Sequence, residues 1–310
     1  MVAQENAFES ALAVFPKDIQ AELKEVLDKG PVIPGEQVAS WVDRLSTSVG
    51  EVMIKLLPIA AAYARVPISN YHVGAVALGM PGLNSPGTLY LGSNVEFRGE
   101  ALSFTVHGEQ CATNHAWLRG ETGIQALAIN AAPCGYCRQF LYETTTAKSL
   151  NILLKTSTDP KDYSYSSSQL TYFLPQAFGP SDLGVTGGLM ESESHGFTIP
   201  QGSNVAQAAL QGANASYAPY TKDYAGVAFQ RDHKTIYVGR CAENAAYNPS
   251  MSPLESALAY MNMHIGKQAP LNITAAALVE AQSDISQKSA TEATLASIAP
   301  GVSLEYVIAS

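Results

Sequence analysis

Two short motifs contain the residues whose types and spacing could do chemistry. The first, HGE, holds His107 and Glu109, and the second, PCGYC, holds Cys134 and Cys137 directly after a proline. One imidazole and two thiolates are ligands that zinc prefers. The C-x-x-C spacing puts both sulfurs on one turn at the start of a helix, where unpaired N–H groups and the helix dipole help to hold sulfur as thiolate. Together the motifs predict a zinc site.

The number of ligands decides what a zinc ion could do there. A structural site uses four protein ligands, whereas a catalytic site uses three and a water molecule. Cys111, one helical turn beyond His107, is a possible fourth ligand, although a small buried residue is the more common role of such a cysteine. With three ligands, one position is left for water, whose pKa zinc lowers from about 15.7 to about 7. Glu109 is then expected to move the proton of that water to a substrate.

The predicted secondary structure places these motifs at the starts of two helices. Apolar spacing and turn residues indicate an alternation of helices and strands, which predicts an α/β fold with helices on both faces of a mixed sheet. Three helices are expected first: one that ends at Gly30, one over 36–45, and one from Ser48 with a kink or break at Pro58. A hairpin of two strands within 73–97 follows. The remaining elements are a helix over 106–119, a strand over 124–130, a helix over 137–144 and a strand over 149–157.

The second half of the chain echoes the first. AAAYARVPISNYHVGAVAL is echoed by ANASYAPYTKDYAGVAFQ, which pairs Gly74 with Gly226, and LYLGSNVEF is echoed by IYVGRCAEN, which pairs Gly92 with Gly239. Two copies are too few for a solenoid, so the echo predicts duplicated domains. The polar segment TDPKDYSYSSSQ between them is expected to be a linker.

The second copy lacks the chemistry of the first. Its segment MSPLES places Pro253 at the position of His107 and Glu255 at the position of Glu109, and no cysteine pair follows Cys241. One zinc ion per chain is therefore expected.

The motif H-x-E followed by P-C-x-x-C is typical of zinc-dependent nucleobase deaminases. The chain resembles the cytidine deaminase family, in particular its dimeric two-domain type with an inactive second copy. The similarity extends over nearly the whole chain and includes SNYHVGA, GSNVEF, PCGYCRQF, LPQAFGP and NAAYNPS. One departure is Gly108, where the family usually has alanine.

The resemblance implies a fold and a set of substrate contacts. The fold is a pair of duplicated three-layer α/β/α cytidine-deaminase-like domains, divided as a helical N-terminal segment at 1–47, a catalytic zinc domain at 48–157, a linker at 158–203 and a degenerate domain without a zinc site at 204–310. The implied contacts are Asn94 and Glu96 with the ribose hydroxyls, Tyr71 with the base, the Gly108 amide with the pyrimidine carbonyl, the Ala132 carbonyl with the amino group, and Phe178 with the site of a neighbouring subunit.

The implied activity is zinc-dependent hydrolytic deamination of cytidine and 2′-deoxycytidine to uridine and 2′-deoxyuridine, with release of ammonia, in pyrimidine salvage. A deoxycytidylate or polynucleotide cytosine deaminase and a non-catalytic structural zinc protein are the alternatives. The net charge of −9 and the scattered Lys and Arg residues argue against a nucleic-acid partner. No apolar run is long enough to span a membrane. A cytoplasmic homodimer that acts on a free nucleoside is expected.

Overall fold

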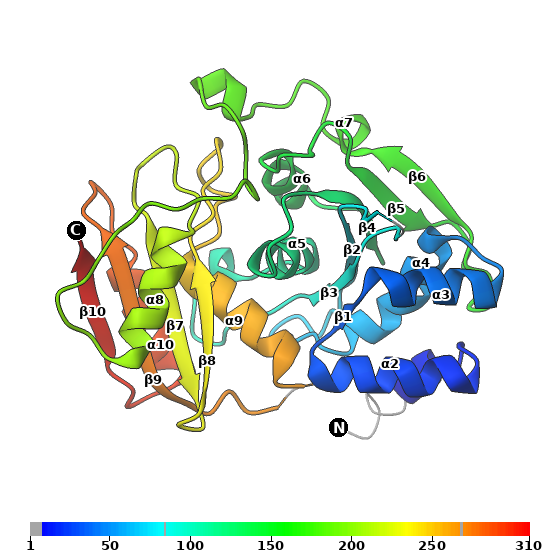
Figure 1. Ribbon diagram of the computed structural model, residues 1–310, viewed down its shortest axis with the longest axis horizontal. Helices are drawn as coiled ribbons and strands as arrows, with labels where there is room; N and C mark the ends of the chain where they lie inside the picture. Colours follow the sequence, from blue (N-terminus) through cyan, green and yellow to red (C-terminus); the bar gives the residue numbers. More distant parts are fainter. Residues whose placement is uncertain (1–7, 84, 267–268) are drawn as a thin grey trace.

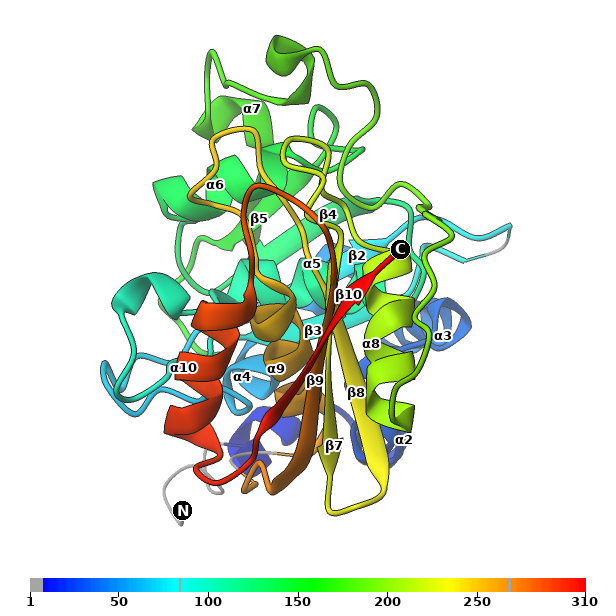
Figure 2. The same ribbon diagram turned by 90° about the vertical axis from the view of Figure 1, so that its left-hand side faces the viewer.

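Two β-sheets, one from each half of the chain, organise the structure (Figure 1). The computed structural model describes residues 8–83, 85–266 and 269–310. The strand order is β1-β3-β2-β4-β5-β6 in the first sheet and β10-β9-β7-β8 in the second. Views at right angles show helices between the two sheets and on their outer faces (Figures 1 and 2). This is the duplicated, layered α/β architecture that the sequence predicts.

The first sheet is mixed, as predicted. β2 pairs antiparallel with β3 and β4, and β4 pairs parallel with β5. Every residue of β2 is buried because α4 and α5 pack against it. The strands are β1 (Val32–Ile33), β2 (Gly74–Gly79), β3 (Leu89–Ser93), β4 (Ile124–Ile129), β5 (Asn151–Lys155) and β6 (Tyr165–Gln169). The helices of this half are α2 (Lys17–Lys29), α3 (Gly35–Leu45), α4 (Val49–Ala61), α5 (Gly108–Leu118), α6 (Gly135–Tyr142) and α7 (Leu170–Phe173), with the 3-10 turn η1 (Leu102–Phe104).

The second sheet repeats the central part of the first. β7 pairs antiparallel with β8 and β9, just as β2 pairs with β3 and β4. β10 pairs parallel with β9, just as β5 pairs with β4. The elements are the 3-10 turn η2 (Pro180–Leu183), α8 (Asn204–Asn214), β7 (Ala225–Arg231), β8 (Thr235–Arg240), α9 (Pro253–His264), β9 (Ile273–Ala281), α10 (Lys288–Ile298) and β10 (Leu304–Ala309).

Two pairs of glycines support the correspondence between the copies. A Cβ atom on Gly74 would lie 2.2 Å from the Leu57 carbonyl oxygen of α4, and one on Gly226 would lie 2.1 Å from the Ala209 oxygen of α8. Cβ atoms on Gly92 and Gly239 would lie 2.2 and 2.1 Å from the backbone nitrogens of Ala112 in α5 and Ala257 in α9. Only glycine lets these helices approach the strands so closely.

The helices α5 and α9 join the two copies between the sheets (Figure 1). Asn114 Nδ2 donates to the Ser256 carbonyl (3.1 Å), and the Ser256 hydroxyl donates to Asn114 Oδ1 (2.7 Å). The His115 ring makes edge contacts with the rings of Tyr260 and His264. The helix α5, which starts at the HGE motif, therefore also forms part of the interface between the two copies.

The first third is helical as predicted, with two differences in detail. Residues 8–12 are helical, but this helix ends before Pro16, and α2 starts at Lys17. The apolar spacing that predicts one helix up to Gly30 therefore runs across a turn. The helix α4 is capped by Ser48, whose hydroxyl accepts from the Glu51 amide (3.2 Å). It continues past Pro58 to Ala61, so the proline does not end it.

The segment that the sequence assigns to a linker contains a strand. β6 pairs antiparallel with β5 at the edge of the first sheet. Its sequence, YSSSQ, is polar and largely exposed, because an edge strand needs to bury little on either face. Tyr165 at its start lies against Gly50 of α4. A strand of this kind has no apolar alternation and is missed by patterning.

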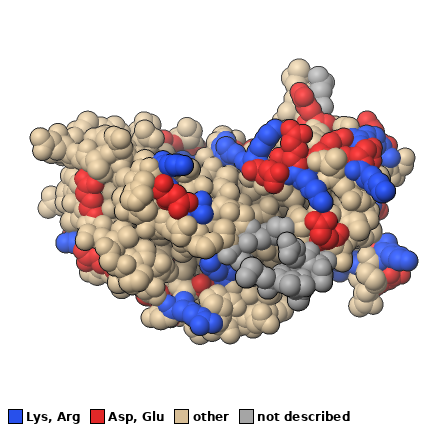
Figure 3. All heavy atoms as spheres, turned by 90° about the horizontal axis from the view of Figure 1, so that it is seen from below, with Lys and Arg blue, Asp and Glu red and all other residues tan. Residues whose placement is uncertain are grey.

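Charges of both signs are intermingled on the face seen from below in Figure 1, and neither sign forms a continuous patch there (Figure 3). In the part of the chain that the structure describes, no helix combines the length and apolar character that crossing a membrane requires.

Candidate active site

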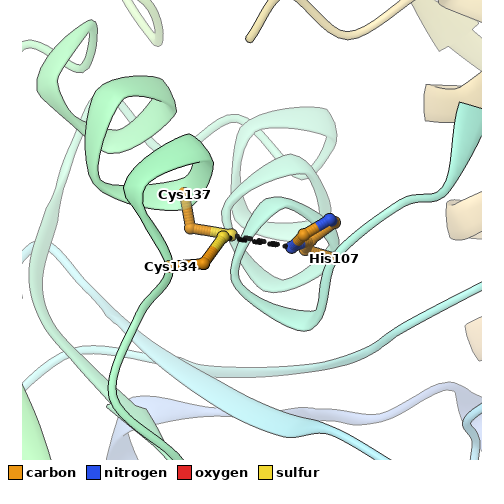
Figure 4. A group of neighbouring side chains, drawn as sticks. All are labelled: His107, Cys134 and Cys137. Carbon is orange, nitrogen blue, oxygen red and sulfur yellow. Dashed lines mark hydrogen bonds between the residues drawn. The ribbon is translucent and has the colours of Figure 1, made fainter. Parts of the chain in front are cut away.

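The imidazole of His107 and the sulfurs of Cys134 and Cys137 converge on one point (Figure 4). His107 precedes α5, Cys134 precedes α6, and Cys137 lies in the first turn of α6. His107 Nδ1 is 3.2 Å from Cys137 Sγ and 3.5 Å from Cys134 Sγ. The starts of these two helices meet, as the sequence predicts.

These three donor atoms fit a tetrahedral zinc ion. Ligands at ordinary Zn–S and Zn–N distances would be about 3.6 Å apart, N to S. The observed separations are close to that value, and the three atoms all lie within 4.8 Å of one another. Among residues 8–83, 85–266 and 269–310, no other His, Cys, Asp or Glu joins a cluster of this kind. Cys111 is buried in the core and is not part of it.

The two thiols are not equivalent. A hydrogen bond from Cys137 lowers the pKa of Cys134 to about 5, and the same contact raises the pKa of Cys137. In this pair one thiolate accepts a hydrogen bond from the other thiol. A zinc ion bound here would require both sulfurs as thiolates. Tyr136, between them, stacks on the His107 ring with the centroids 5.4 Å apart.

Glu109 lies beside the ligands in a cavity of about 300 Å³. Only 5% of its surface is exposed, and this burial raises its pKa. A carboxyl group whose pKa is raised toward neutrality can both accept and donate a proton. The cavity is lined by most of the predicted site residues, namely Tyr71, Asn94, Glu96, His107, Gly108, Glu109, Ala132 and Cys134, and also by Ser69, Val73, Thr105, Ile129 and Ala131.

Two of the predicted residues, Asn94 and Glu96, shape the wall of this cavity. Asn94 Oδ1 accepts from the Val73 amide, and its Nδ2 donates to the Tyr71 carbonyl (both 2.9 Å). Glu96 accepts from the amides of Ile68 (2.9 Å) and Ser69 (3.0 Å) and from the Ser69 hydroxyl. Both side chains thus fix the segment that carries Tyr71, whose own side chain is 57% exposed at the cavity mouth.

The charge of Glu96 is maintained by its surroundings. Burial alone would raise its pKa, but the hydrogen bonds from Ser69 and Ile68 outweigh burial and hold the pKa below its usual value. Glu96 therefore presents a carboxylate to the cavity near neutral pH.

Two predicted site residues do not line this cavity: Cys137, which is buried behind it with the other ligands, and Phe178. The Phe178 side chain is 46% exposed, and its carbonyl accepts from Gln139 Nε2 (2.7 Å).

Sequence reasoning missed two groups that position the site. Gln110 Oε1 accepts from the His107 amide (3.0 Å) and so fixes the start of α5. A Gln three residues after a capping position is a recognisable helix-start pattern, so this contact was open to prediction. Ser69 was signalled by the repeat, since P-x-S in the first copy matches P-x-T, ending at Thr221, in the second.

The structure corrects the alignment of the two helix starts. Ser252 caps α9 and is bonded reciprocally with Glu255, as the His107 amide is bonded to Gln110. Glu255 therefore corresponds to Gln110, not to Glu109, and Ser252, not Pro253, takes the place of His107. The predicted match was wrong by one residue because it aligned two glutamates without regard to the cap. Leu254, which is buried, occupies the place of Glu109.

Comparisons with known proteins identify the family of this chain. Two family models, both described as "Cytidine and deoxycytidylate deaminase zinc-binding region", match residues 48–152 and 170–292. A cytidine deaminase of Photobacterium profundum is 41% identical over 303 residues, which cover 96% of this chain and 98% of that protein. One of Vibrio cholerae is 42% identical over 306 residues, covering 97% and 99%. A solved cytidine deaminase from Mycobacterium tuberculosis is 30% identical over 41% of this chain and 95% of its own, with a TM-score of 0.33. The chain belongs to the cytidine deaminase family.

Proposed function

We propose that this protein catalyses the zinc-dependent hydrolytic deamination of cytidine and 2′-deoxycytidine to uridine and 2′-deoxyuridine, with release of ammonia. The observation that carries the proposal is the cluster of His107, Cys134 and Cys137, next to the buried carboxyl group of Glu109, at a cavity that His107, Cys134 and Glu109 line. Relatives about 40% identical over nearly the full chain bear the name cytidine deaminase.

His107, Cys134 and Cys137 would hold the zinc ion, and the described residues offer no fourth ligand to their cluster. Zinc bound there supplies a Lewis acid that lowers the pKa of a water molecule. Glu109 accepts a proton from the attacking water and gives it to ring N3, which makes C4 of the base electrophilic. The water oxygen bonds to C4, and Glu109 then takes the second proton of that oxygen and gives it to the amino nitrogen. The C4–N bond breaks, ammonia leaves, and C4=O forms. The Gly108 amide holds the pyrimidine carbonyl, and the Ala132 carbonyl accepts from the amino group.

The wall of the cavity suits a sugar. Asn94 and Glu96 bind the ribose hydroxyls, because an amide and a carboxylate together offer donors and acceptors to neighbouring hydroxyl groups. A deoxynucleoside keeps the 3′-hydroxyl for the same contact. Tyr71 packs against the base at the cavity mouth.

The charge of the cavity favours a free nucleoside over a phosphorylated substrate. None of the described lining residues is Lys or Arg, and two are glutamates. A phosphate group would need basic partners. Turnover of cytidine, deoxycytidylate and cytosine in single-stranded DNA, measured side by side, tests this choice. The nucleoside should be preferred, and faster turnover of either phosphorylated substrate would contradict the proposal.

We further propose a homodimer in which Phe178 of one subunit reaches the cavity of the other, and a role in pyrimidine salvage in the cytoplasm. The exposure of Phe178 supports the first part, since an exposed aromatic side chain is free to contact a partner. The proposed division is a helical segment at 1–47, a catalytic domain at 48–157, a connecting segment at 158–203 that adds β6 to the first sheet, and a degenerate domain at 204–310.

A non-catalytic zinc protein is the alternative that the proposal must exclude. It would need a fourth protein ligand, and the described residues offer only three donor atoms at this point. One zinc ion per chain is expected, since the second copy has a serine, a leucine and no cysteine pair at the corresponding positions.

A further inference from the structure

The helix α6, which carries the cysteine ligands, is too short to be stable by itself. It has eight residues, and isolated helices below about 12 residues are marginal in water. Contacts with the rest of the protein must therefore set its position and, with it, the position of Cys134 and Cys137 relative to His107.

Residues of the second copy form hydrogen bonds with one buried carboxylate at the end of α6. Glu143, directly after the helix, is fully buried. Its Oε1 accepts from the hydroxyls of Tyr217 (2.8 Å) and Tyr220 (2.5 Å), and its Oε2 accepts from the Ala245 amide (2.9 Å). All three donors come from the second copy. No ion pair among the described residues includes Glu143. Burial raises its pKa, and the three neutral donors act against burial by favouring the carboxylate.

A second contact lies one turn earlier on the helix. Asn244 Nδ2 donates to the Gln139 carbonyl (2.9 Å), and Gln139 Nε2 lies 3.4 Å from Asn244 Oδ1. Asn244 is the neighbour of Ala245 in the chain, so one short segment of the second copy bonds to two successive turns of α6. This fixes both the rotation of the helix and its position along its axis.

The two tyrosines are specific to the copy that lacks zinc ligands. By the Gly74–Gly226 correspondence, Tyr217 and Tyr220 stand at the positions of Arg65 and Ile68. Arg65 donates instead to Asn262 Oδ1 (3.1 Å) and the Ala269 carbonyl (2.6 Å), and the Ile68 side chain is half exposed. The second copy therefore has two tyrosine hydroxyls, directed at α6 of the first copy, at positions where the first copy has none.

We infer that the degenerate second copy preorganises the zinc site of the first through the Tyr217–Glu143–Tyr220 contact. Glu143 is a positioning residue: it touches neither metal nor substrate and acts through α6. The inference rests on the zinc site of the proposed function. Metal affinity depends on groups that hold the ligands in place, and loss of one such partner typically costs about 10- to 100-fold.

Zinc release from the full-length protein tests this inference. The double variant Tyr217→Phe/Tyr220→Phe removes both hydroxyls without opening a large cavity, and zinc transfer to an excess of a chromogenic chelator gives the release rate. The variant should release zinc about 10-fold faster or more. Glu143→Gln is a second variant, which decides the matter if the double variant does not fold. Its one amide oxygen cannot accept from the tyrosine hydroxyls and from the Ala245 N–H at once, so this variant should also speed release.

Tyr306→Phe is the matched control. It removes a tyrosine–carboxylate hydrogen bond of the same kind within the second copy, from Tyr306 to Glu280 Oε1 (2.8 Å), away from α6. Its zinc release should equal that of the wild type, whatever the melting temperatures of the metal-free proteins. Wild-type release rates in a folded double variant or in Glu143→Gln, or an equal acceleration in Tyr306→Phe, would overturn the inference. A wild-type protein that binds no zinc would instead refute the proposed function itself.

Discussion

Glu96 in the first copy and Glu243 in the second accept the same three hydrogen bonds from equivalent loops. The donors are the Ile68 and Ser69 amides and the Ser69 hydroxyl for Glu96, and the Tyr220 and Thr221 amides and the Thr221 hydroxyl for Glu243. Only Glu96 lies in the cavity with the metal-ligand cluster. Variants of the two glutamates can therefore distinguish the loop contact, which both make, from the substrate contact proposed for Glu96.

Glu96→Gln and Glu243→Gln should destabilise the fold to a similar extent. Each loses its charge and turns its amide NH2 toward the Ser69 or Thr221 hydroxyl, while the amide oxygen can still accept from the two backbone N–H groups. Only Glu96→Gln should also raise KM for cytidine, by about 10- to 100-fold, the value of a lost hydrogen bond to a charged group. Steady-state kinetics and urea unfolding of both variants measure the two effects. Equal KM values for the two variants would refute the ribose contact.

Gly108 lies against Val73, which leaves too little room for the methyl group of an alanine. A Cβ atom at this position would lie 2.8 Å from Val73 Cγ1, which must then move. Because Val73 lines the cavity, Gly108→Ala should raise KM for cytidine, at a cost of about 1–3 kcal/mol from overpacking. The second change Val73→Ala should restore KM. If Gly108→Ala alone leaves KM unchanged, the cavity tolerates the methyl group and this explanation fails.

His115 should make stability depend on pH. It is fully buried, its Nδ1 is 2.9 Å from the Leu91 carbonyl, and burial lowers its pKa to about 3. The unfolded chain binds the proton near pH 6.5, so stability falls as pH decreases from about 6.5 toward 3, by up to about 1.4 kcal/mol per pH unit for this group. His115→Asn keeps a donor for Leu91 but does not titrate. The difference in unfolding free energy between the wild type and this variant should therefore become smaller as pH falls.

Urea unfolding of the metal-free proteins at several pH values between about 5 and 7.5 measures this difference. Asp223 and Glu255, whose pKa values burial raises to about 6 and about 7, act in the opposite direction, but they are present in both proteins and cancel. A difference in unfolding free energy that stays constant across this range would show that His115 does not titrate as its burial requires.

The sequence allowed the chemically active residues of the site to be predicted, but not the contacts that hold those residues in place. The ligand cluster and the two helix starts could be predicted because each depends on a local pattern: a C-x-x-C turn, a histidine before a helix and alternating elements. The glycine pairs revealed the duplication because close helix approach excludes every other residue. All of these signals lie within a few residues of the feature that they predict.

What could not be predicted depends on contacts between distant parts of the chain. Glu143 lies 74 and 77 residues before its partners Tyr217 and Tyr220, and nothing near Glu143 in the sequence identifies them. The edge strand β6 buries too little to leave an apolar pattern. The one-residue error at Glu255 arose because a capping residue and a catalytic one can share an amino-acid type.

Glu109→Gln, with zinc content and cytidine turnover measured on the same samples, tests the central claim most directly. The account predicts one zinc ion per chain in both proteins, and uridine and ammonia in equal amounts from the wild type. The variant should turn over about 10²- to 10⁴-fold more slowly, because the proton carrier is lost while the ligands remain. Wild-type ammonia release by a zinc-loaded Glu109→Gln protein would contradict the account.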